Sequence, residues 1–365
     1  MKITKIETIT VGLPFVNPGP DSSFAIAEKN ILNSLLIRIE TDKGIIGWGE
    51  AFGYTSIETT KAAIHSMIIP NLIGKTIETK NDIEFINKEL HLKLHIFGRY
   101  GITIFALSGI DIALWDILGK AENKSIAELL GGLKVQSLKA YASLFLYDDA
   151  DATSKVSLKA KNEGYEIIKL HENTLPPIQA SRKAIGDTPL MVDVNCVWSE
   201  IYMDEIIDVL KQAKLYWLEE PIWPPENYSG LSKLRDQNIT IASGENACTS
   251  YQFKEMIDNN AADILQPSVT KVGGISEIIK IAALKKKNCR VVPHSPYFGP
   301  GFIATLQVIG ALTPDSEIER LYVDLKADLY DGVSNIDQNG KITIPDSPGL
   351  GIEPNLDVLE KYSIK

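Results

Sequence analysis

Three acidic residues recur at a constant interval in the second half of the chain, each at the end of a short apolar run. Asp193 ends LMVD, Glu219 ends YWLE and Glu245 follows ITIASG, so that successive acids are 26 residues apart. Neighbouring parallel strands lie about 4.8 Å apart, so carboxylates at their ends would converge and raise one another's pKa. A hard divalent cation resolves this conflict, and oxygen ligands favour Mg²⁺ first and Mn²⁺ second. Salt bridges to lysine are the alternative interpretation.

Two basic residues end another apolar run, in GYEIIKLHENT, residues 164–174. Alternate side chains of a strand share a side, so Lys169 and His171 should point the same way. A nearby cation and partial burial would lower the pKa of Lys169, which makes a lysine a usable general base. His171 would assist or act as base itself, and His294, in RVVPHS, would face the substrate from the opposite side. A structural ion pair of Lys169 is the alternative.

These groups together suit removal of a proton next to a carboxylate. Two bases beside a carboxylate held by a cation can take the α-proton, and the cation stabilises the resulting enediolate. Further polar residues end the other apolar runs and are predicted to surround the substrate: Asn195, Glu220, Ser268 and Glu319. Asn195 shares the face of Asp193 and would orient a ligand or substrate oxygen. Any one of these residues could be an ordinary solvated strand end, but their shared position favours a site.

Eight short β-like runs would position these residues. They extend from LKAYASL to EIERLYV, and helix-compatible segments such as TSYQFKEMIDNNA separate most of them. Strands that alternate with helices predict a parallel sheet, and eight such units predict a closed (β/α)8 barrel with its site at the C-terminal strand ends. An open doubly wound sheet is the alternative, although no glycine-rich phosphate loop follows the first strand.

The first third of the chain has a different pattern. NSLLIRIETDKGIIGWGEA contains two apolar runs around Asp42-Lys43-Gly44, which predicts a β-hairpin. Residues 102–120 place apolar side chains at helical spacing and predict a packed helix. A mixed α+β segment is therefore expected to precede the barrel.

Composition argues against several classes of protein. The 365 residues carry a formal net charge of −10, which does not suit binding to nucleic acid. Three scattered cysteines show neither zinc spacing nor a disulfide framework, so a reduced cytoplasm is expected. Residues 291–313 carry no formal charge, but prolines and glycines interrupt them, which argues against a membrane helix. The N-terminus lacks the pattern of a signal peptide.

Five segments resemble the mandelate racemase and muconate lactonizing enzyme branch of the enolase superfamily, and the resemblance covers nearly the whole chain. ALSGIDIALWDILGKAENKSIAELLGG resembles the N-terminal signature, and LMVDVN followed by WLEEP resembles the second signature. ILQPSVTKVGG and VVPHSPYFGPG are similar to the sixth and seventh strand ends, and ITIPDSPGLGIE to the C-terminal tail. The resemblance implies an α+β capping domain over residues 1–125, a modified catalytic barrel over 126–325 and a segment over 326–365 that returns to the cap.

The resemblance also implies roles for individual residues. Asp193, Glu219 and Glu245 would hold Mg²⁺, and Lys169 falls on the first lysine of the family's Lys-X-Lys pair. His294 falls on the seventh-strand histidine, and Glu319 on the eighth-strand glutamate that can hydrogen-bond the enediolate. Loops within residues 14–30 of the cap would help to choose the substrate.

Two positions depart from the family pattern. His171 stands where the second lysine is usual, and Ser268 stands where an aspartate usually pairs with the seventh-strand histidine. The Ser268 hydroxyl would then accept the other ring N–H of His294 without supplying a negative charge.

The sequence therefore predicts a Mg²⁺-dependent lyase or isomerase of sugar-acid catabolism that acts on a hydroxylated carboxylic acid. Dehydration through an enediolate is slightly favoured, and a cycloisomerase or a racemase or epimerase on a related hydroxy acid or lactone is the alternative. Two other classes stay open: a non-catalytic metal-binding relative, and an unrelated barrel such as a Schiff-base aldolase using Lys169. The expected partners are a small carboxylate and, from the family, further copies of the chain, with neither nucleic acid nor membrane.

Overall fold

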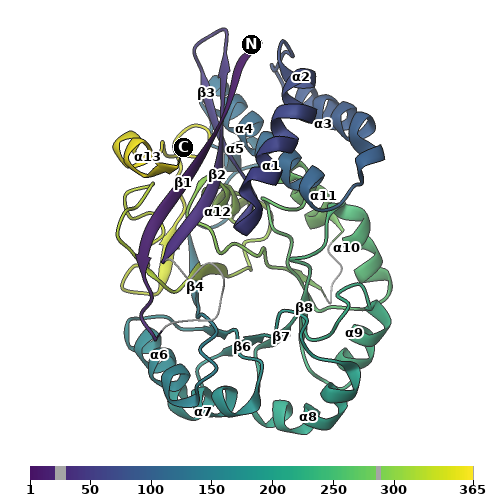
Figure 1. Ribbon diagram of the computed structural model, residues 1–365, viewed down its shortest axis with the longest axis vertical. Coiled ribbons are helices and arrows are strands. Elements are labelled where there is room, and N and C mark those ends of the chain that lie inside the picture. Colours follow the sequence, from purple (N-terminus) through teal and green to yellow (C-terminus); the bar gives the residue numbers. More distant parts are fainter. Residues whose placement is uncertain (21–29, 285–288, 365) are drawn as a thin grey trace.

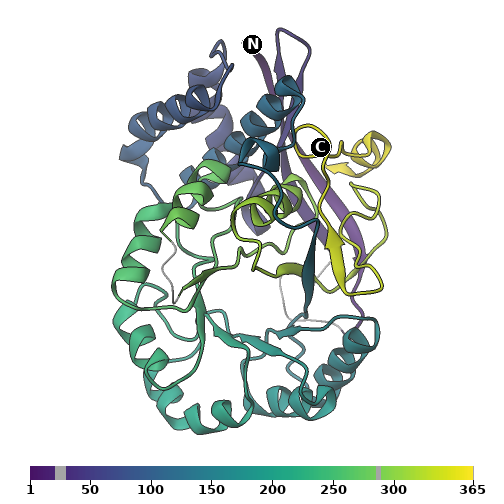
Figure 2. The same ribbon diagram turned by 180° about the vertical axis from the view of Figure 1, so that it is seen from behind.

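The protein consists of an α+β cap over a ring of strands and helices, as the computed structural model shows for residues 1–20, 30–284 and 289–364 (Figure 1). Seen from behind, the strands of the lower part curl around a common interior, and helices cover the outside of the ring (Figure 2). The predicted fold class is confirmed: a modified (β/α)8 barrel carries an α+β N-terminal cap.

The parallel sheet of the barrel has the spatial order β10-β9-β8-β7-β6-β5-β4-β11, and all eight predicted runs form these strands. The strands are β4 (Ser137–Ser143), β5 (Ile168–Leu170), β6 (Leu190–Asp193), β7 (Trp217–Glu219), β8 (Ile241–Ser243), β9 (Ile264–Leu265), β10 (Arg290–Val291) and β11 (Ile318–Leu321). Helices follow the strands and are α6 (Ala150–Asn162), α7 (Leu175–Ile185), α8 (Glu200–Gln212), α9 (Tyr228–Arg235), α10 (Thr249–Asp258), α11 (Gly274–Ala283) and α12 (Pro300–Leu312). Side chains that accept backbone N–H groups start several of them, such as Asp149 before α6 and Ser199 before α8.

Side chains close the ring between β10 and β11. Within the described residues, no strand ladder joins these two strands. Instead the guanidinium of Arg290 donates to Glu317 at 2.6 Å, and the hydroxyl of Ser316 donates to the carbonyl of Val291. One step higher, the backbone N–H of Ser295 donates to Glu319 at 2.9 Å. We call this boundary the β10–β11 seam.

An apolar layer fills the lower interior of the barrel. Its members lie in or next to seven successive strands and are Tyr141, Ile167, Met191, Trp217, Ala242, Ile264 and Val292. Side chains of a strand alternate between its two faces, so the residue two positions further along each strand faces the same interior, one layer closer to the cap. We call this second level the upper ring.

The cap combines an antiparallel sheet with helices. Its sheet contains β1 (Ile3–Val16), β2 (Ile31–Thr41) and β3 (Ile46–Ala51), and β2 and β3 form the predicted hairpin. Gly44 turns that hairpin with φ of +74°, a conformation that glycine adopts without strain. The helical segments are η2 (Tyr54–Ser56), α1 (Ile57–Ala63), η3 (Ile64–Ile68), α2 (Ile69–Leu72), α3 (Lys80–Leu94), η4 (His95–Phe97), α4 (Ile102–Glu122) and α5 (Ile126–Leu129).

Helix α4 is the apolar core of the cap, and its few polar residues fasten it to other parts of the chain. The hydroxyl of Ser108 accepts the N–H of Gly273, and the carboxylate of Asp111 accepts the N–H and the hydroxyl of Ser276, which ties α4 to the start of α11 in the barrel. Asp116 accepts backbone N–H groups from β3 and from the C-terminal tail. One helix thereby connects cap, barrel and tail.

Length and hydropathy would let α4 cross a membrane, but its surroundings argue otherwise. Of its most apolar window, 89% is buried inside the fold, as expected for a core helix. The uncharged residues 291–313 give β10 and the shorter buried helix α12, so no described helix spans that stretch. The three cysteines are buried and free.

The C-terminal tail contacts both parts of the molecule. β12 (Asp324–Leu325) and β14 (Ser363–Ile364) pair with β1 of the cap, whereas β13 (Lys341–Thr343) pairs with β4 of the barrel. Helix α13 (Leu356–Tyr362) leads into β14, which places the C-terminus beside β1 (Figure 1). The segment boundaries at residues 125 and 325 stay predictions.

The substrate-choosing loop expected within residues 14–30 is described only in part. Residues 21–29 lie outside the described residues, and residues 14–16 belong to β1 rather than to a loop. Asn17 reaches the barrel, because its side-chain oxygen accepts the hydroxyl of Tyr147 at 3.0 Å.

Replacement of Asp111 by alanine should lower the free energy of unfolding by about 3 kcal/mol, because it leaves the buried amide of Asn87 and the two donors of Ser276 without this acceptor. Chemical denaturation of Asp111→Ala measures this loss. Glu122→Ala, at the exposed end of the same helix, is the control and should unfold like the parent protein. Equal stability of the two variants would contradict a fastening role for Asp111.

Candidate active site and metal centre

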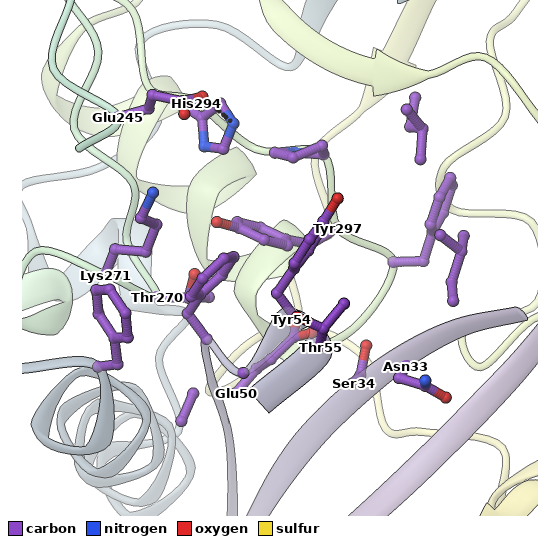
Figure 3. A pocket seen from close by; sticks show the side chains of 18 of the residues that line it. Asn33, Ser34, Glu50, Tyr54, Thr55, Glu245, Thr270, Lys271, His294 and Tyr297 are labelled. Atoms are coloured by element: carbon purple, nitrogen blue, oxygen red, sulfur yellow. Dashed lines mark ion pairs between the residues drawn. The ribbon is translucent and has the colours of Figure 1, made fainter. Parts of the chain in front are cut away.

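A cavity of about 890 Å³ lies between the cap and the C-terminal ends of the barrel strands. The barrel contributes Glu245, Lys271 and His294 to its wall, and the cap contributes Ser34 and Glu50 (Figure 3). The cavity therefore opens where the sequence analysis places the chemistry.

The three predicted metal ligands converge beneath this cavity. Asp193 ends β6, Glu219 ends β7 and Glu245 follows β8, and one carboxylate oxygen of each lies within 4.8 Å of the others. Asp193 and Glu219 are fully buried, and Glu245 is largely buried. Consecutive parallel strands produce this arrangement, because each ends at the same edge of the sheet.

Lys169 stands among these acids rather than apart from them. Its ammonium lies 2.5 Å from Glu219, 3.0 Å from Asp193 and 3.3 Å from Glu319, and its side chain is fully buried. Burial alone would lower the pKa of Lys169, but the carboxylates, led by Asp193 and Glu219, raise it well above its usual value. The acids thus outweigh the loss of solvent among the protein groups alone. The lowered pKa expected for Lys169 beside a bound cation stays a prediction.

The same contacts shift the pKa values of the acids in opposite directions. Burial would raise the pKa of Asp193, but Lys169 and His171 hold it far below the usual range. Burial, reinforced by Asp193, raises the pKa of Glu219 well above its usual value even though Lys169 opposes this. Burial acts to raise the pKa of Glu245 as well, yet His294 and Lys271 lower it to about 2. These carboxylates outnumber the positively charged side chains that could neutralise them, so their pKa values shift apart.

One carboxylate oxygen of Asp193 lacks a hydrogen bond of suitable geometry among the described groups. Its Oδ2 is buried and lies near Lys169 and His171, yet neither they nor any other described group makes a hydrogen bond to it with suitable angles. One lysine faces three carboxylates here, and Glu245 brings a fourth. An open carboxylate oxygen within an excess of buried negative charge fits a hard divalent cation.

His171 and Lys169 point the same way, as predicted. Nε2 of His171 lies 3.3 Å from the same Oδ2 of Asp193 that Lys169 approaches. Nδ1 of His171 lies 2.5 Å from the carbonyl oxygen of Leu144, so the imidazole is held between β4 and β6. His171 also lines the cavity.

His294 lies across from this pair, and its expected contact with Ser268 is absent. Nε2 of His294 lies 3.0 Å from Glu245, while Nδ1 is buried without a hydrogen-bond partner among the described residues. The Ser268 hydroxyl instead lies 2.5 Å from the hydroxyl of Tyr297, whose ring is edge-on to His294. The predicted Ser268–His294 hydrogen bond is wrong because Tyr297 takes the serine hydroxyl.

Ser268→Ala should therefore affect stability more than turnover. The hydroxyl of Tyr297 would lose its 2.5 Å partner, which should lower the free energy of unfolding by about 1 kcal/mol. Turnover should change little, because the serine hydroxyl does not contact His294. Denaturation and steady-state kinetics on the same preparation check both parts, and a large loss of turnover with unchanged stability would contradict this geometry.

The other predicted residues divide into two groups. Glu319 lies at the cavity, where it accepts the hydroxyl of Ser143 at 2.8 Å, and Asn195 lines the cavity and donates its backbone N–H to Asp193 at 2.9 Å. Glu220 is not among the described residues that line the cavity. It is almost fully buried and accepts from Ser243 and from the N–H of Gly244, both at 2.8 Å, on the strand end that precedes Glu245.

Sequence reasoning missed several polar residues of the cavity wall, among them Lys271, Tyr297 and Glu50. Lys271 lies with its ammonium 4.9 Å from the ring centre of Phe52 and extends toward Glu245 and His294 (Figure 3). Tyr297 and Glu50 also line the cavity, and burial raises the pKa of Glu50 to about 7. The position of Lys271 after the sixth strand could have identified it, but nothing in the strand pattern of the cap marks Glu50.

Two family models together match most of the chain. Residues 14–131 match the mandelate racemase / muconate lactonizing enzyme N-terminal domain, and residues 152–358 match the enolase C-terminal domain-like model.

Named relatives match over nearly their full length. The D-galactarolactone cycloisomerase of Agrobacterium fabrum is 34% identical, with 99% of both chains covered. The arabinonate dehydratase of Saccharolobus solfataricus is 32% identical, with 90% of both chains covered. The crystal structure of the 3,6-anhydro-D-galactonate cycloisomerase from Zobellia galactanivorans superimposes with a TM-score of 0.85 at 30% identity and covers 100% of both chains. The chain therefore belongs to the mandelate racemase and muconate lactonizing enzyme family of the enolase superfamily, and it is an enzyme of the lyase or isomerase class.

Proposed function

We propose that the protein removes the α-proton of a sugar acid and that elimination of a β-hydroxyl group follows, which amounts to dehydration. Asp193, Glu219 and Glu245 would hold Mg²⁺, with Mn²⁺ as a substitute. The observation that carries the proposal is the convergence of these carboxylates, within 4.8 Å, next to the buried ammonium of Lys169. Relatives named as sugar-acid dehydratases and cycloisomerases support it.

Lys169 is the proposed base. When bound, the cation would neutralise the carboxylates and stabilise the negative charge of the enediolate. The amine of Lys169, released from its contacts with these acids, would take the proton from the α-carbon. His171, fixed by the carbonyl of Leu144, would stay beside Lys169 and keep the amine directed at the substrate. The electrons of the broken C–H bond then form the C=C bond as the β C–O bond breaks.

Glu319 beside Lys169, and His294 across the cavity, would handle the enediolate and the leaving group. Glu319 is held by Ser143 and by the N–H of Ser295, and it is the proposed hydrogen-bonding partner of the enediolate. His294 would return a proton, and Asn195 would orient a substrate oxygen. The resulting enol becomes a 2-oxo acid by proton transfer to carbon.

Ring opening by a cycloisomerase is the second candidate. Two of the relatives that match over full length are cycloisomerases, and Nδ1 of His294 has no acceptor among the described residues. Elimination that opens a lactone expels a carboxylate, which leaves without a proton from an acid. This route therefore needs no proton from His294, whereas the loss of hydroxide does.

A screen of aldonic acids, aldaric acids and their lactones with Mg²⁺ tests the proposal. Dehydration gives a 2-oxo acid one water lighter than its substrate, whereas ring opening gives an isomer of unchanged mass. In D₂O, a racemase or epimerase would return substrate with deuterium at the α-carbon and no elimination product. Failure of the whole set to react or to exchange would count against proton abstraction from sugar acids.

The biological setting of this reaction also stays a proposal. A small carboxylate is the expected partner, and assembly into a homo-oligomer and a place in the cytoplasm are expected from the sequence alone.

A further inference from the structure

Gln266 belongs to the upper ring of the barrel, the level that carries the proposed catalytic groups. It follows Ile264 of the apolar layer by two residues, just as Lys169, Asp193 and Glu219 follow Ile167, Met191 and Trp217. The backbone N–H of Gln266 donates to the carbonyl of Ser243 at 3.0 Å, so the strand pairing that fixes its orientation continues through this residue. The side chain of Gln266 therefore faces the barrel interior.

The side-chain carboxamide of Gln266 has no hydrogen-bond partner among the described groups of the barrel interior. The residue is fully buried, and neither its Oε1 nor its Nε2 makes a hydrogen bond to any described group. Nearby Lys169, Glu219 and Glu319 are paired with one another. Asp193 and His294 each leave one polar atom without a partner among the described groups, whereas Gln266 leaves both of its polar atoms. A buried amide without partners destabilises the fold, and a methionine would fill the same space without that cost.

The level of Gln266 restricts what it can bind. Like Asp193 and Glu219, it is buried and is not among the described residues that line the open cavity, so its ligand must reach the depth of the metal carboxylates. An amide presents one acceptor and two donors, which suits a species that both donates and accepts. Water has this property and is the smallest species that enters a protein together with a hydrated divalent cation.

We propose that Gln266 binds a water molecule that enters with the divalent cation, and that it is a positioning residue of the metal centre. This inference rests on the proposed function, because it assumes the cation. It adds to the three carboxylates a neutral residue from the next strand of the ring, β9. A water held permanently by the fold, with no relation to the cation, is the competing explanation.

The test combines the stability of the metal-free protein with the affinity for Mg²⁺. Gln266→Met should raise the thermal midpoint of the metal-free protein, because two unpaired polar atoms are lost. The same variant should bind Mg²⁺ about 10- to 100-fold more weakly in a calorimetric titration, the usual effect of losing a residue that supports a metal site indirectly. Gln266→Asn, which keeps the amide but is too short, should weaken Mg²⁺ binding similarly.

Thr313→Val is the matched control. Its hydroxyl is also buried without a partner among the described groups, but it follows α12 on the outside of the barrel. This variant should leave Mg²⁺ affinity unchanged.

Unchanged Mg²⁺ affinity in Gln266→Met and Gln266→Asn, with a parent protein that binds Mg²⁺, would overturn the inference and leave the proposed function intact. A lower thermal midpoint of metal-free Gln266→Met would also overturn it, because the amide would then have a permanent partner. A parent protein that binds no Mg²⁺ would overturn the proposed function, and this inference with it.

Discussion

Exhaustive treatment with EDTA should abolish turnover of a sugar acid, and added Mg²⁺ should restore it. Asp193, Glu219 and Glu245 bring their oxygens within 4.8 Å of one another, and Lys169 alone cannot neutralise them together with Glu319. Without a cation, the excess of carboxylates in the site would repel the carboxylate of a substrate. Activity assays before chelation, after it and after re-addition of Mg²⁺ or Mn²⁺ measure the effect.

Glu219→Gln tests the same centre within the chain. The amide keeps the shape of the side chain but removes the charge that attracts the cation, so most of the Mg²⁺ affinity should be lost while the fold stays intact. Glu166→Gln, at an exposed position on the N-terminal side of β5, is the control and should bind Mg²⁺ normally. Full activity after chelation that removes all detectable metal would refute the requirement for a cation.

Lys169→Ala should lower kcat by about 10²- to 10⁴-fold or more, the usual effect of losing a general base. Exchange of the substrate α-proton with D₂O should fall in parallel, because the amine of Lys169 is the proposed group that takes this proton. His171→Ala should lose less, since His171 contacts Asp193 and the carbonyl of Leu144 and is expected to hold Lys169 in place.

Lys169→Ala needs a check on stability, because its ammonium faces three buried acids. Loss of one partner from a buried ion pair can cost about 3 to 5 kcal/mol. Circular dichroism and Mg²⁺ titration of the variant separate loss of the base from loss of the fold. If His171→Ala is inactive while Lys169→Ala still turns over, the two roles are reversed.

The repeating pattern of the chain predicted the barrel and the position of the acids. Units of one strand and one helix repeat from residue 138 onward. Side chains at the same position in successive units must therefore meet at one edge of a parallel sheet. Asp193, Glu219 and Glu245 could therefore be brought together before any coordinates were known. Membership of the enolase superfamily also excludes the unrelated Schiff-base aldolase, a class that the residues alone left open.

Contacts between side chains from distant parts of the chain were beyond sequence reasoning. Ser268 meets Tyr297 rather than His294 because both lie in loops whose path depends on packing against the cap. Glu220 directly follows Glu219, a proposed metal ligand, but supports the end of β8 instead of lining the cavity. Gln266 looks like any polar strand end until its burial and lack of partners are known.

Ring closure at the β10–β11 seam depends on side chains, whereas every other joint of the ring has a strand ladder. Local opening takes place where few backbone hydrogen bonds hold two elements together, so the seam should be the joint that opens first and forms last. His294 follows β10 on one side of the seam, and Glu319 lies in β11 on the other side. An opening would break the bond between the Ser295 N–H and Glu319 while β4 to β9 stayed paired, and that N–H should exchange with solvent hydrogen sooner than those of β6 and β7. A nascent chain could thus complete most of its barrel and still lack a working active site until the two ends of the sheet meet.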